Sequence, residues 1–291
     1  MQNFPLVSVI CLSYNHEAYV VEALNSVINQ TYPNVELLIS DDCSTDNSVE
    51  MIKNWLGNHP EVHFLVNEKN LGNTKTFNQL AKKAKGEFII DLAADDILLP
   101  NCIEKQITTF QNSNYKNLGI VYGNLIEMDE NGNFISNYYT EEDYPESGDI
   151  YKMVVGRTTK ICSVSSMIKK TVLEKLNFYD ENLAYEDLDL WIRTSRDFDF
   201  EYIPEVLAKK RILSDSLSSH FLMENNLRAK KLNASTLQIL IKAFQLNRTK
   251  EEHKALLGRI RFEVYKFIKA RNFSLLFQLF LLEIKVRLKS I

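Results

Sequence analysis

Strand-like and helix-like segments alternate through the first hundred residues, and this alternation restricts the chain to a small number of folds. Short apolar runs, typical of buried strands, are followed each time by apolar residues at helical spacing. Strands that are connected through helices run parallel in one sheet. The sequence therefore predicts an α/β fold with a mainly parallel central sheet. The expected strands are Leu6–Leu12, Val35–Ile39, Val62–Val66 and Phe88–Leu92, and the expected helices are Glu17–Gln30, Val49–Leu56 and Thr74–Lys85.

The rest of the chain has a less regular pattern. Asn131-Gly132 separates two alternating runs within residues 125–139 and predicts a hairpin. From about Ser218 onward the pattern is helical. With 291 residues and 45% apolar content, the chain has enough material for one large domain or two closely fused ones. Further elements are expected at Pro100 to about Asn112 (helix), Gly119–Tyr122 (strand), Cys162–Ile168 (strand) and Leu188–Arg196 (helix).

Polar side chains follow three of the expected strands, at the sheet edge where α/β proteins bind their ligands. The first strand is followed by Ser13, Tyr14 and Asn15, the second by Asp41 and Asp42, and the fourth by Asp95 and Asp96. Each aspartate pair alone is typical of a turn or a helix N-cap. Together at one edge, the carboxylates favour Mg²⁺ or Mn²⁺ that arrives with a nucleotide diphosphate. Neither a GxGxxG turn nor a GxxxxGK[ST] loop occurs, so a nucleotide site would rely on the metal and side chains.

Two long stretches carry a family resemblance: VSVICLSYNHEAYVVEALNSVINQTYPNVELLISDDCSTDNS and NEKNLGNTKTFNQLAKKAKGEFIIDLAADDILLP. They resemble the family-2 inverting glycosyltransferases of the GT-A fold, and the similarity extends over roughly residues 5–215. The resemblance implies a Rossmann-like sheet, a nucleotide-sugar donor and Mn²⁺ or Mg²⁺. It implies a donor site of Ser13, Tyr14, Asn15, Asp41, Asp42, Asn70, Asn78, Asp95 and Arg211, with Asp96 and His220 as metal ligands.

Within that site the resemblance implies individual roles. Tyr14 would flank the base and Asp42 would hydrogen-bond it, with Asp41 as a helper. Asp95 would bind the ribose, and Asp96 would bind the metal and hence the diphosphate. Family members often have an arginine just before the second asparagine, and Phe77 occupies that position here.

The segment LAYEDLDLWIRTS, residues 183–195, resembles the acidic acceptor-side segment of the same family. An inverting transfer needs a base that removes the proton of the acceptor hydroxyl. The resemblance assigns this role to Asp187, with Glu186 as the second candidate. Without the resemblance, the same residues would be a charged helix N-terminus above a core of Leu188, Trp191 and Ile192.

The expected activity is a metal-dependent, inverting transfer from a nucleotide-diphosphate sugar, with UDP as the default nucleotide. The acceptor would be a glycan or a lipid-linked oligosaccharide in cell-surface polysaccharide synthesis. A sugar nucleotidyltransferase is an alternative, but its Gly-rich basic loop is missing from SYNHEAYV. A catalytically inactive nucleotide-sugar-binding module is the other alternative, and Asp96 together with Asp187 argues against it. The three expected segments are a nucleotide-sugar-binding half (1–100), an acceptor-binding half (101–217) and a basic helical region (218–291).

Charge is distributed unevenly along the chain. Residues 1–221 hold 19 Lys+Arg and 33 Asp+Glu, whereas residues 222–291 hold 15 and 5. The last part, residues 273–291, has an apolar face at helical spacing near several cations: Leu275, Leu276, Leu279, Leu282 and Val286, widened by Phe277, Phe280 and Leu281. This pattern predicts a helical hairpin packed on the catalytic domain, a dimer contact, or an interfacial helix on anionic lipid. No signal peptide and no spanning segment is recognised, so the expected location is cytoplasmic and peripheral at the inner face of the membrane, with no nucleic-acid partner.

Overall fold

The computed structural model describes residues 4–143, 145–156, 161–214, 221 and 226–291. Its contacts divide the chain into two compact units that interleave along the sequence. The first unit comprises residues 1–148, 161–179 and 199–212, and the second comprises residues 149–160, 180–198 and 213–291. The expected three-segment division of the chain stays a prediction.

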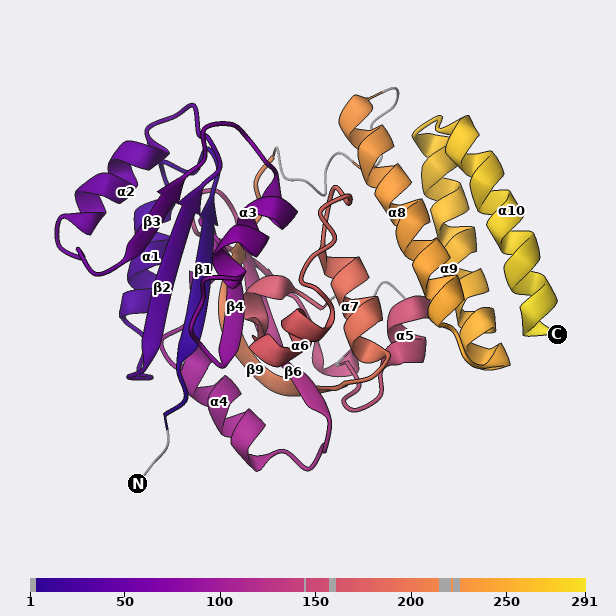
Figure 1. The fold of residues 1–291 in the computed structure, drawn as a ribbon, viewed down its shortest axis with the longest axis horizontal. Helices are drawn as coiled ribbons and strands as arrows, with labels where there is room; N and C mark the ends of the chain where they lie inside the picture. Colours follow the sequence, from indigo (N-terminus) through magenta and orange to yellow (C-terminus); the bar gives the residue numbers. More distant parts are fainter. Residues whose placement is uncertain (1–3, 144, 157–160, 215–220, 222–225) are drawn as a thin grey trace. The chain divides into compact units, whose positions relative to one another are not determined.

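The first unit is built on a nine-stranded sheet whose main path has the order β3-β2-β1-β4-β8-β6-β9-β5. The neighbours β3, β2, β1 and β4 are parallel, which confirms the prediction for the first hundred residues. The helices α1 and α3 pack beside β1 in this part of the sheet (Figure 1). These elements are β1 (Val7–Ser13), α1 (Val20–Ile28), β2 (Val35–Asp41), α2 (Ser48–Leu56), β3 (His63–Val66), α3 (Asn73–Ala81) and β4 (Phe88–Ala93).

The other half of the sheet has mixed strand directions. β8 (Ser166–Lys169) runs antiparallel to both β4 and β6. A strand was expected at Cys162–Ile168, but Ser163–Ser165 form a 3-10 turn and the strand β8 begins only at Ser166. The hairpin predicted at Asn131-Gly132 is present, because β7 pairs antiparallel with β6. The remaining elements of this unit are β5 (Ile97–Leu98), α4 (Cys102–Asn112), β6 (Leu118–Met128), β7 (Phe134–Asn137), η1 (Glu141–Asp143), α6 (Lys170–Lys175) and β9 (Asp199–Arg211).

The strand β9 has thirteen residues and was not predicted. Its sequence DFEYIPEVLAKKR contains a proline and several charges, which obscure the alternation of a strand. β9 nevertheless pairs with β6 along most of its length, with register shifts near Gly123. A Cβ atom at Gly123 would lie 2.4 Å from Leu207, so this close crossing requires glycine. β9 thereby carries Arg211 back to the edge of the sheet.

The second unit consists of helices. It contains α5 (Tyr151–Gly156), α7 (Asp187–Ser195), α8 (Leu227–Leu246), α9 (Lys250–Lys269) and α10 (Phe273–Ser290). α9 begins with a capping box in which Thr249 and Glu252 satisfy each other's backbone N–H groups. α10 packs mainly against α9 and also against α8 (Figure 1). None of the helices in the part of the chain that the structure describes is long and apolar enough to cross a membrane.

Candidate functional site

The carboxyl ends of β2, β1 and β4 lie side by side at one edge of the sheet. Ser13 is paired in register with Asp41, and the last residues of β4 run alongside β1. The chain continues the pairing past the strands, since Asp42 N donates to Ser13 O at 2.9 Å. The structure therefore brings together Ser13, Asp41, Asp42, Asp95 and Asp96 at the edge where the sequence placed the donor site.

Two of the aspartates are bound to the loops around them. Asp41 accepts hydrogen bonds from Ser44 N at 2.8 Å and Ser44 Oγ at 2.6 Å. Asp42 accepts from Asn67 Nδ2, Leu71 N and Gly72 N, each at 2.8 Å. Both carboxylates are thus stabilised by hydrogen bonds from local N–H and O–H donors rather than by cations.

The loop after β1 presents an aromatic ring to solvent. Asn15 adopts a left-handed backbone conformation with φ 57°. Its side chain accepts from Thr45 N at 2.8 Å, which ties the first loop to the loop after β2. Tyr14 is 44% exposed beside this turn, so its ring is free to stack on a planar ligand. Asn70 is also exposed, on the loop that Asp42 holds.

Asp95 and Asp96 form a carboxylate pair just beyond β4. Asp96 is 4% exposed, and its Oδ1 accepts from Arg211 N at 2.8 Å. Burial, together with the neighbouring charge of Asp95, holds the pKa of Asp96 well above its usual range. The one ion-pair partner of Asp95 among the described residues is His16, whose Nε2 lies 3.9 Å from Oδ1. Within the described residues, no side-chain nitrogen of lysine or arginine lies within 4 Å of either carboxylate.

The guanidinium of Arg211 is directed to other groups. It donates to the backbone oxygens of Asp95, Asp129 and Glu130 and to the carboxylate of Glu22. It also lies over the ring of Tyr19, 4.4 Å from the centroid. Since four of its five N–H donors are engaged, Arg211 braces the end of β4 against the β6–β7 hairpin. Its expected contact with the donor stays a prediction.

Asn78 is likewise engaged with protein groups. It is 2% exposed, its Nδ2 donates to Tyr179 O at 2.9 Å, and its Oδ1 accepts from Tyr179 N at 3.0 Å. The ring of Tyr179 stacks on Phe77, with the centroids 4.2 Å apart, and its Oη donates to Asp91 at 2.9 Å. Asn78 therefore fixes the segment that ends at Tyr179, and its expected role in donor binding is untested.

Burial has a large effect on Asp91, which lies within β4. Desolvation raises the pKa of its carboxyl to about 7, and the hydrogen bond from Tyr179 opposes that shift. Asp91 is not among the site residues that the sequence predicts. Its partner Tyr179 went unnoticed, because the two residues are far apart in the chain.

The acidic acceptor-side segment belongs to the helical unit. Glu186 occupies the N-cap position of α7, and Asp187 is the exposed first residue of that helix. Asp187 Oδ1 accepts from Leu188 N at 2.6 Å. The neighbouring Asp189, which sequence reasoning passed over, is 1% exposed and is held by Arg193 Nε at 2.6 Å and Lys242 Nζ at 2.7 Å. The segment is thus fixed to α8 by ion pairs.

The fit of a divalent ion can be judged from the donor set. Asp95 and Asp96 offer hard carboxylate oxygens, and Ser13 Oγ is a buried hydroxyl without a hydrogen-bond partner in the described structure. Among the residues that the structure describes, no group of three or more His, Cys, Asp or Glu side chains is arranged to hold a metal. His220 lies outside the described residues. Two carboxylates match an ion that is completed by the phosphates of its ligand, as is common for magnesium.

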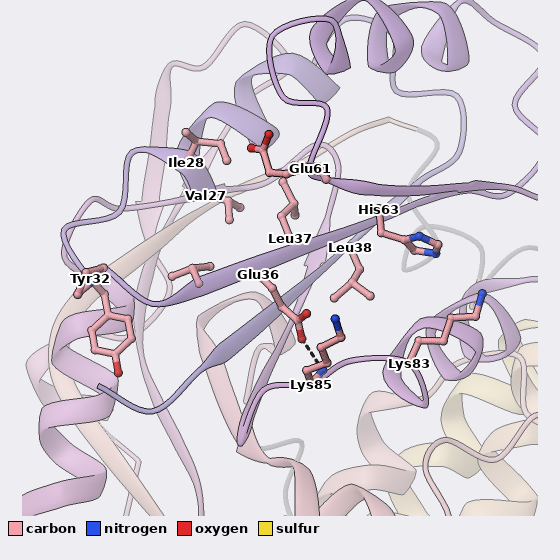
Figure 2. Close-up of a pocket in the computed structure, with 13 residues that line it drawn as sticks. Val27, Ile28, Tyr32, Glu36, Leu37, Leu38, Glu61, His63, Lys83 and Lys85 are labelled. Carbon is pink, nitrogen blue, oxygen red and sulfur yellow. Dashed lines mark hydrogen bonds between the residues drawn. The ribbon is translucent and has the colours of Figure 1, made fainter. Parts of the chain in front are cut away.

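A pocket of about 510 Å³ lies at the opposite, amino-terminal ends of β2 and β3. Figure 2 shows Glu36, His63 and Lys85 among its lining residues. The pocket contains none of the predicted site residues. Since ligands of parallel sheets bind beyond the carboxyl ends of the strands, we do not assign the donor to it.

Sequence comparison identifies relatives of known class. Residues 8–176 match the family "Glycosyl transferase family 2". An uncharacterized glycosyltransferase of Methanocaldococcus jannaschii is 31% identical over 211 residues, which are 72% of this chain and 71% of the relative. The chondroitin synthase of Escherichia coli is 27% identical over 219 residues, 75% of this chain but 30% of that protein.

Solved structures share the fold at lower sequence identity. The mannosyltransferase PcManGT from Pyrobaculum calidifontis, in complex with GDP-Man and Mn²⁺, matches with a TM-score of 0.65 at 16% identity, covering 93% of this chain and 74% of that one. Residues 1–349 of TarS from S. aureus, in complex with UDP-GlcNAc, match with a TM-score of 0.65 at 18% identity, covering 92% and 74%. The fold predicted from the sequence, the GT-A fold with C-terminal helices, is confirmed.

Proposed function

This chain belongs to glycosyltransferase family 2, and from that premise we propose that it moves a sugar from a nucleotide-diphosphate sugar to a hydroxyl of a glycan or lipid-linked oligosaccharide. The observation that carries this proposal is the carboxylate pair Asp95–Asp96. It lies at the ligand-binding edge of the sheet, and the described residues place no side-chain nitrogen of lysine or arginine within 4 Å of its carboxylate oxygens. Such a pair is suited to a metal and a diphosphate.

The divalent ion, Mn²⁺ or Mg²⁺, would be held by Asp96, with His220 as a second protein ligand. Asp95 would bind the ribose beside it. When bound, such an ion stabilises the charge that develops on a departing diphosphate. The Mn²⁺ in the PcManGT complex supports the use of a divalent ion.

The nucleotide base would bind near the loops after β1 and β2. The exposed ring of Tyr14 supplies a stacking surface, and Asp42 lies on the adjoining strand end. Solved neighbours were captured with UDP-GlcNAc and with GDP-Man, which supports a nucleotide-diphosphate sugar as the donor. We propose UDP as the nucleotide.

The transfer would invert the anomeric carbon in a single displacement. The acceptor oxygen forms its bond to that carbon as the bond to the diphosphate breaks, and the hydroxyl proton passes to the carboxylate of Asp187. The exposure of Asp187 at the start of α7 supports this role, because a base must be reachable by the acceptor. Glu186 remains the second candidate. The product would enter cell-surface polysaccharide synthesis at the inner face of the membrane.

The test is a panel of nucleotide sugars incubated with the protein and Mn²⁺ or Mg²⁺, with the products identified by mass spectrometry. Slow release of free nucleoside diphosphate is expected with one donor, and chelation of the metal should abolish it. If pyrophosphate is added and the nucleotide sugar is converted to a nucleoside triphosphate and a sugar 1-phosphate, the protein is a sugar nucleotidyltransferase instead. Donor binding without any release, with acceptors present, would identify an inactive binding module.

A further inference from the structure

Helix α10 has two apolar faces, and the structure shows which of them is packed inside the unit. Leu279, Leu282 and Val286 are buried, and α10 packs against α9 and α8. These residues belong to the apolar face predicted from the sequence, and they are covered within the helical unit. Phe277, Phe280 and Leu281, which widen that face, are exposed on the side of α10 that meets the solvent.

The outward face of α10 is also apolar. Its side chains recur at intervals of three or four residues, which places them on one stripe along a helix of about 27 Å. Each of them is between 42% and 85% exposed. We call this stripe the outer face of α10; it consists of Phe273, Phe277, Phe280, Leu281, Ile284, Leu288 and Ile291.

Cations border the outer face, and no exposed acid occurs in residues 258–291, all of which are described. Lys285 and Lys289 are exposed beside the stripe, and Arg271 is exposed just before the helix. The two acids between residues 258 and 291 are Glu263, which is fully buried, and Glu283, which is mostly covered and paired with Arg287. The border of the outer face is therefore uniformly basic.

The end of α9 has the same composition. Phe262, Tyr265 and Ile268 are about half exposed, with Arg261 and Lys269 as exposed neighbours. Lys269 Nζ lies 5.0 Å from the centre of the Tyr265 ring. Exposed apolar residues that cluster on adjacent helices mark an interaction surface rather than ordinary scatter.

We propose that the outer face of α10 binds the surface of an anionic lipid membrane. Phenylalanine and leucine side chains would enter the acyl boundary, while the flanking lysines meet anionic headgroups. A second copy of the chain fits this face less well, because a two-fold contact would bring two basic borders together. Protein interfaces are also depleted in lysine. The proposal depends on neither the donor nor the metal assignment.

The experiment is co-sedimentation of the full chain with vesicles, without donor or metal. Vesicles of equal parts phosphatidylglycerol and phosphatidylcholine should bind the protein at about 0.05 M salt and release it at about 0.5 M. Pure phosphatidylcholine vesicles should bind it about tenfold less. Equal binding to both vesicle types, or to neither, would overturn the proposal.

Paired variants locate the binding surface. Phe277→Ser/Phe280→Ser should lower binding to anionic vesicles about tenfold, and Lys285→Glu/Lys289→Glu should do the same. The matched controls are Phe134→Ser, an exposed phenylalanine on β7, and Lys53→Glu/Lys116→Glu, an equal change of charge elsewhere. Both controls should bind as the wild type does. Circular dichroism should be unchanged throughout, because every substituted side chain is exposed.

Two outcomes would assign the surface differently. If light scattering shows a dimer that Phe277→Ser/Phe280→Ser dissolves, and vesicles do not bind, a second copy covers the outer face and the lipid proposal is wrong. If the controls lose binding as strongly as the α10 variants, the attraction depends on overall charge and the outer face is not the docking surface.

Discussion

Buried carboxylates are stabilised differently in the two units. In the sheet unit they accept hydrogen bonds from neutral donors: Asp42 from Leu71 N and Gly72 N, and Asp96 from Arg211 N. In the helical unit they pair with cationic side chains, as Asp189 does with Lys242. A neutral donor stabilises a carboxylate without cancelling its charge, whereas a lysine or arginine cancels it.

This difference distinguishes carboxylates that are available to a ligand from carboxylates whose ion pairs stabilise the fold. The helical unit contains further buried pairs of the same kind, Arg196 with Glu252 at 2.8 Å and Arg259 with Glu263 at 2.8 Å. Each of these carboxylates is already paired with an arginine, so we do not expect it to bind a metal. Among the described residues, the carboxyl groups of Asp95 and Asp96 beyond β4 have no lysine or arginine side-chain nitrogen within 4 Å, so they are available to a cation from solution. The comparison therefore assigns chemistry to the sheet edge and stability to the ion pairs.

The strongest test substitutes Asp96. Asp96→Asn keeps the shape and the hydrogen bond from Arg211 N but removes the charge, so transfer should fall by about 10³-fold or more, equivalent to about 4 kcal/mol. Steady-state rates at saturating Mn²⁺ measure this loss. Glu50→Gln, an exposed acid on α2, is the control and should be fully active. If Asp96→Asn transfers at the wild-type rate, or if the wild-type protein stays fully active after exhaustive chelation, transfer does not require a metal held by Asp96.

The next effect concerns stability alone. Asp189→Asn removes the ion pair of Asp189 with Arg193 and its ion pair with Lys242, which keeps its pair with Asp180. We expect a loss of about 3 kcal/mol in the free energy of unfolding, the low end for a broken buried pair, because both cations keep some contact with water. Urea denaturation followed by circular dichroism measures it.

The control for this test is an exposed pair in the same unit. Glu251 lies 4.0 Å from Lys254, and both side chains are more than half exposed, so Glu251→Gln should leave the denaturation midpoint unchanged. If Asp189→Asn unfolds no more readily than Glu251→Gln, the buried ion pairs of Asp189 do not stabilise the helical unit.

The third test substitutes Asp187, the residue of the helical unit that we propose as the base. Asp187→Asn should lower the transfer rate by about 10²-fold, equivalent to about 2.7 kcal/mol, because the amide cannot take up the acceptor proton. Donor affinity, measured by calorimetry, should change little. If Glu186→Gln loses the activity instead, the base is one residue earlier. Normal transfer in both variants would mean that the acidic segment serves only as a helix start.

Local patterns predicted the parallel half of the sheet and the positions of its strand ends. Apolar strands such as Val35–Asp41 are recognisable without their neighbours, and parallel connection then places their ends together. β9 escaped prediction because its strand character comes from pairing with β6 rather than from its own residues. The same limit applies to α10, where two apolar faces are visible in the sequence but only packing decides which one is covered.

Side-chain partners distant in sequence account for the other differences. Asn78 and Tyr179 are separated by 101 residues, and Arg211 and Glu22 by 189. No periodicity relates such pairs, so the sequence assigned Asn78 and Arg211 to the donor by resemblance alone. Asp91 belongs to the same class, because its hydrogen-bond partner, Tyr179, is 88 residues away in the sequence.

The smallest expected effect concerns Asp91. It tests whether this carboxyl, like the other buried carboxyls of the sheet unit, is held by a neutral hydrogen-bond donor that leaves its charge uncancelled. Its pKa of about 7 in the folded protein exceeds the ordinary value near 3.8, so folding favours its protonated form. The contribution of this group to stability is therefore fully present below about pH 4 and is lost as the pH rises through 7. Asp91→Asn, which cannot ionise, should raise the melting temperature at pH 8 by a few degrees and change it little at pH 4. Glu50→Gln should show no such difference. A melting temperature at pH 8 that is lowered by Asp91→Asn would show that the ionised carboxylate, with Tyr179 as donor, stabilises the fold instead.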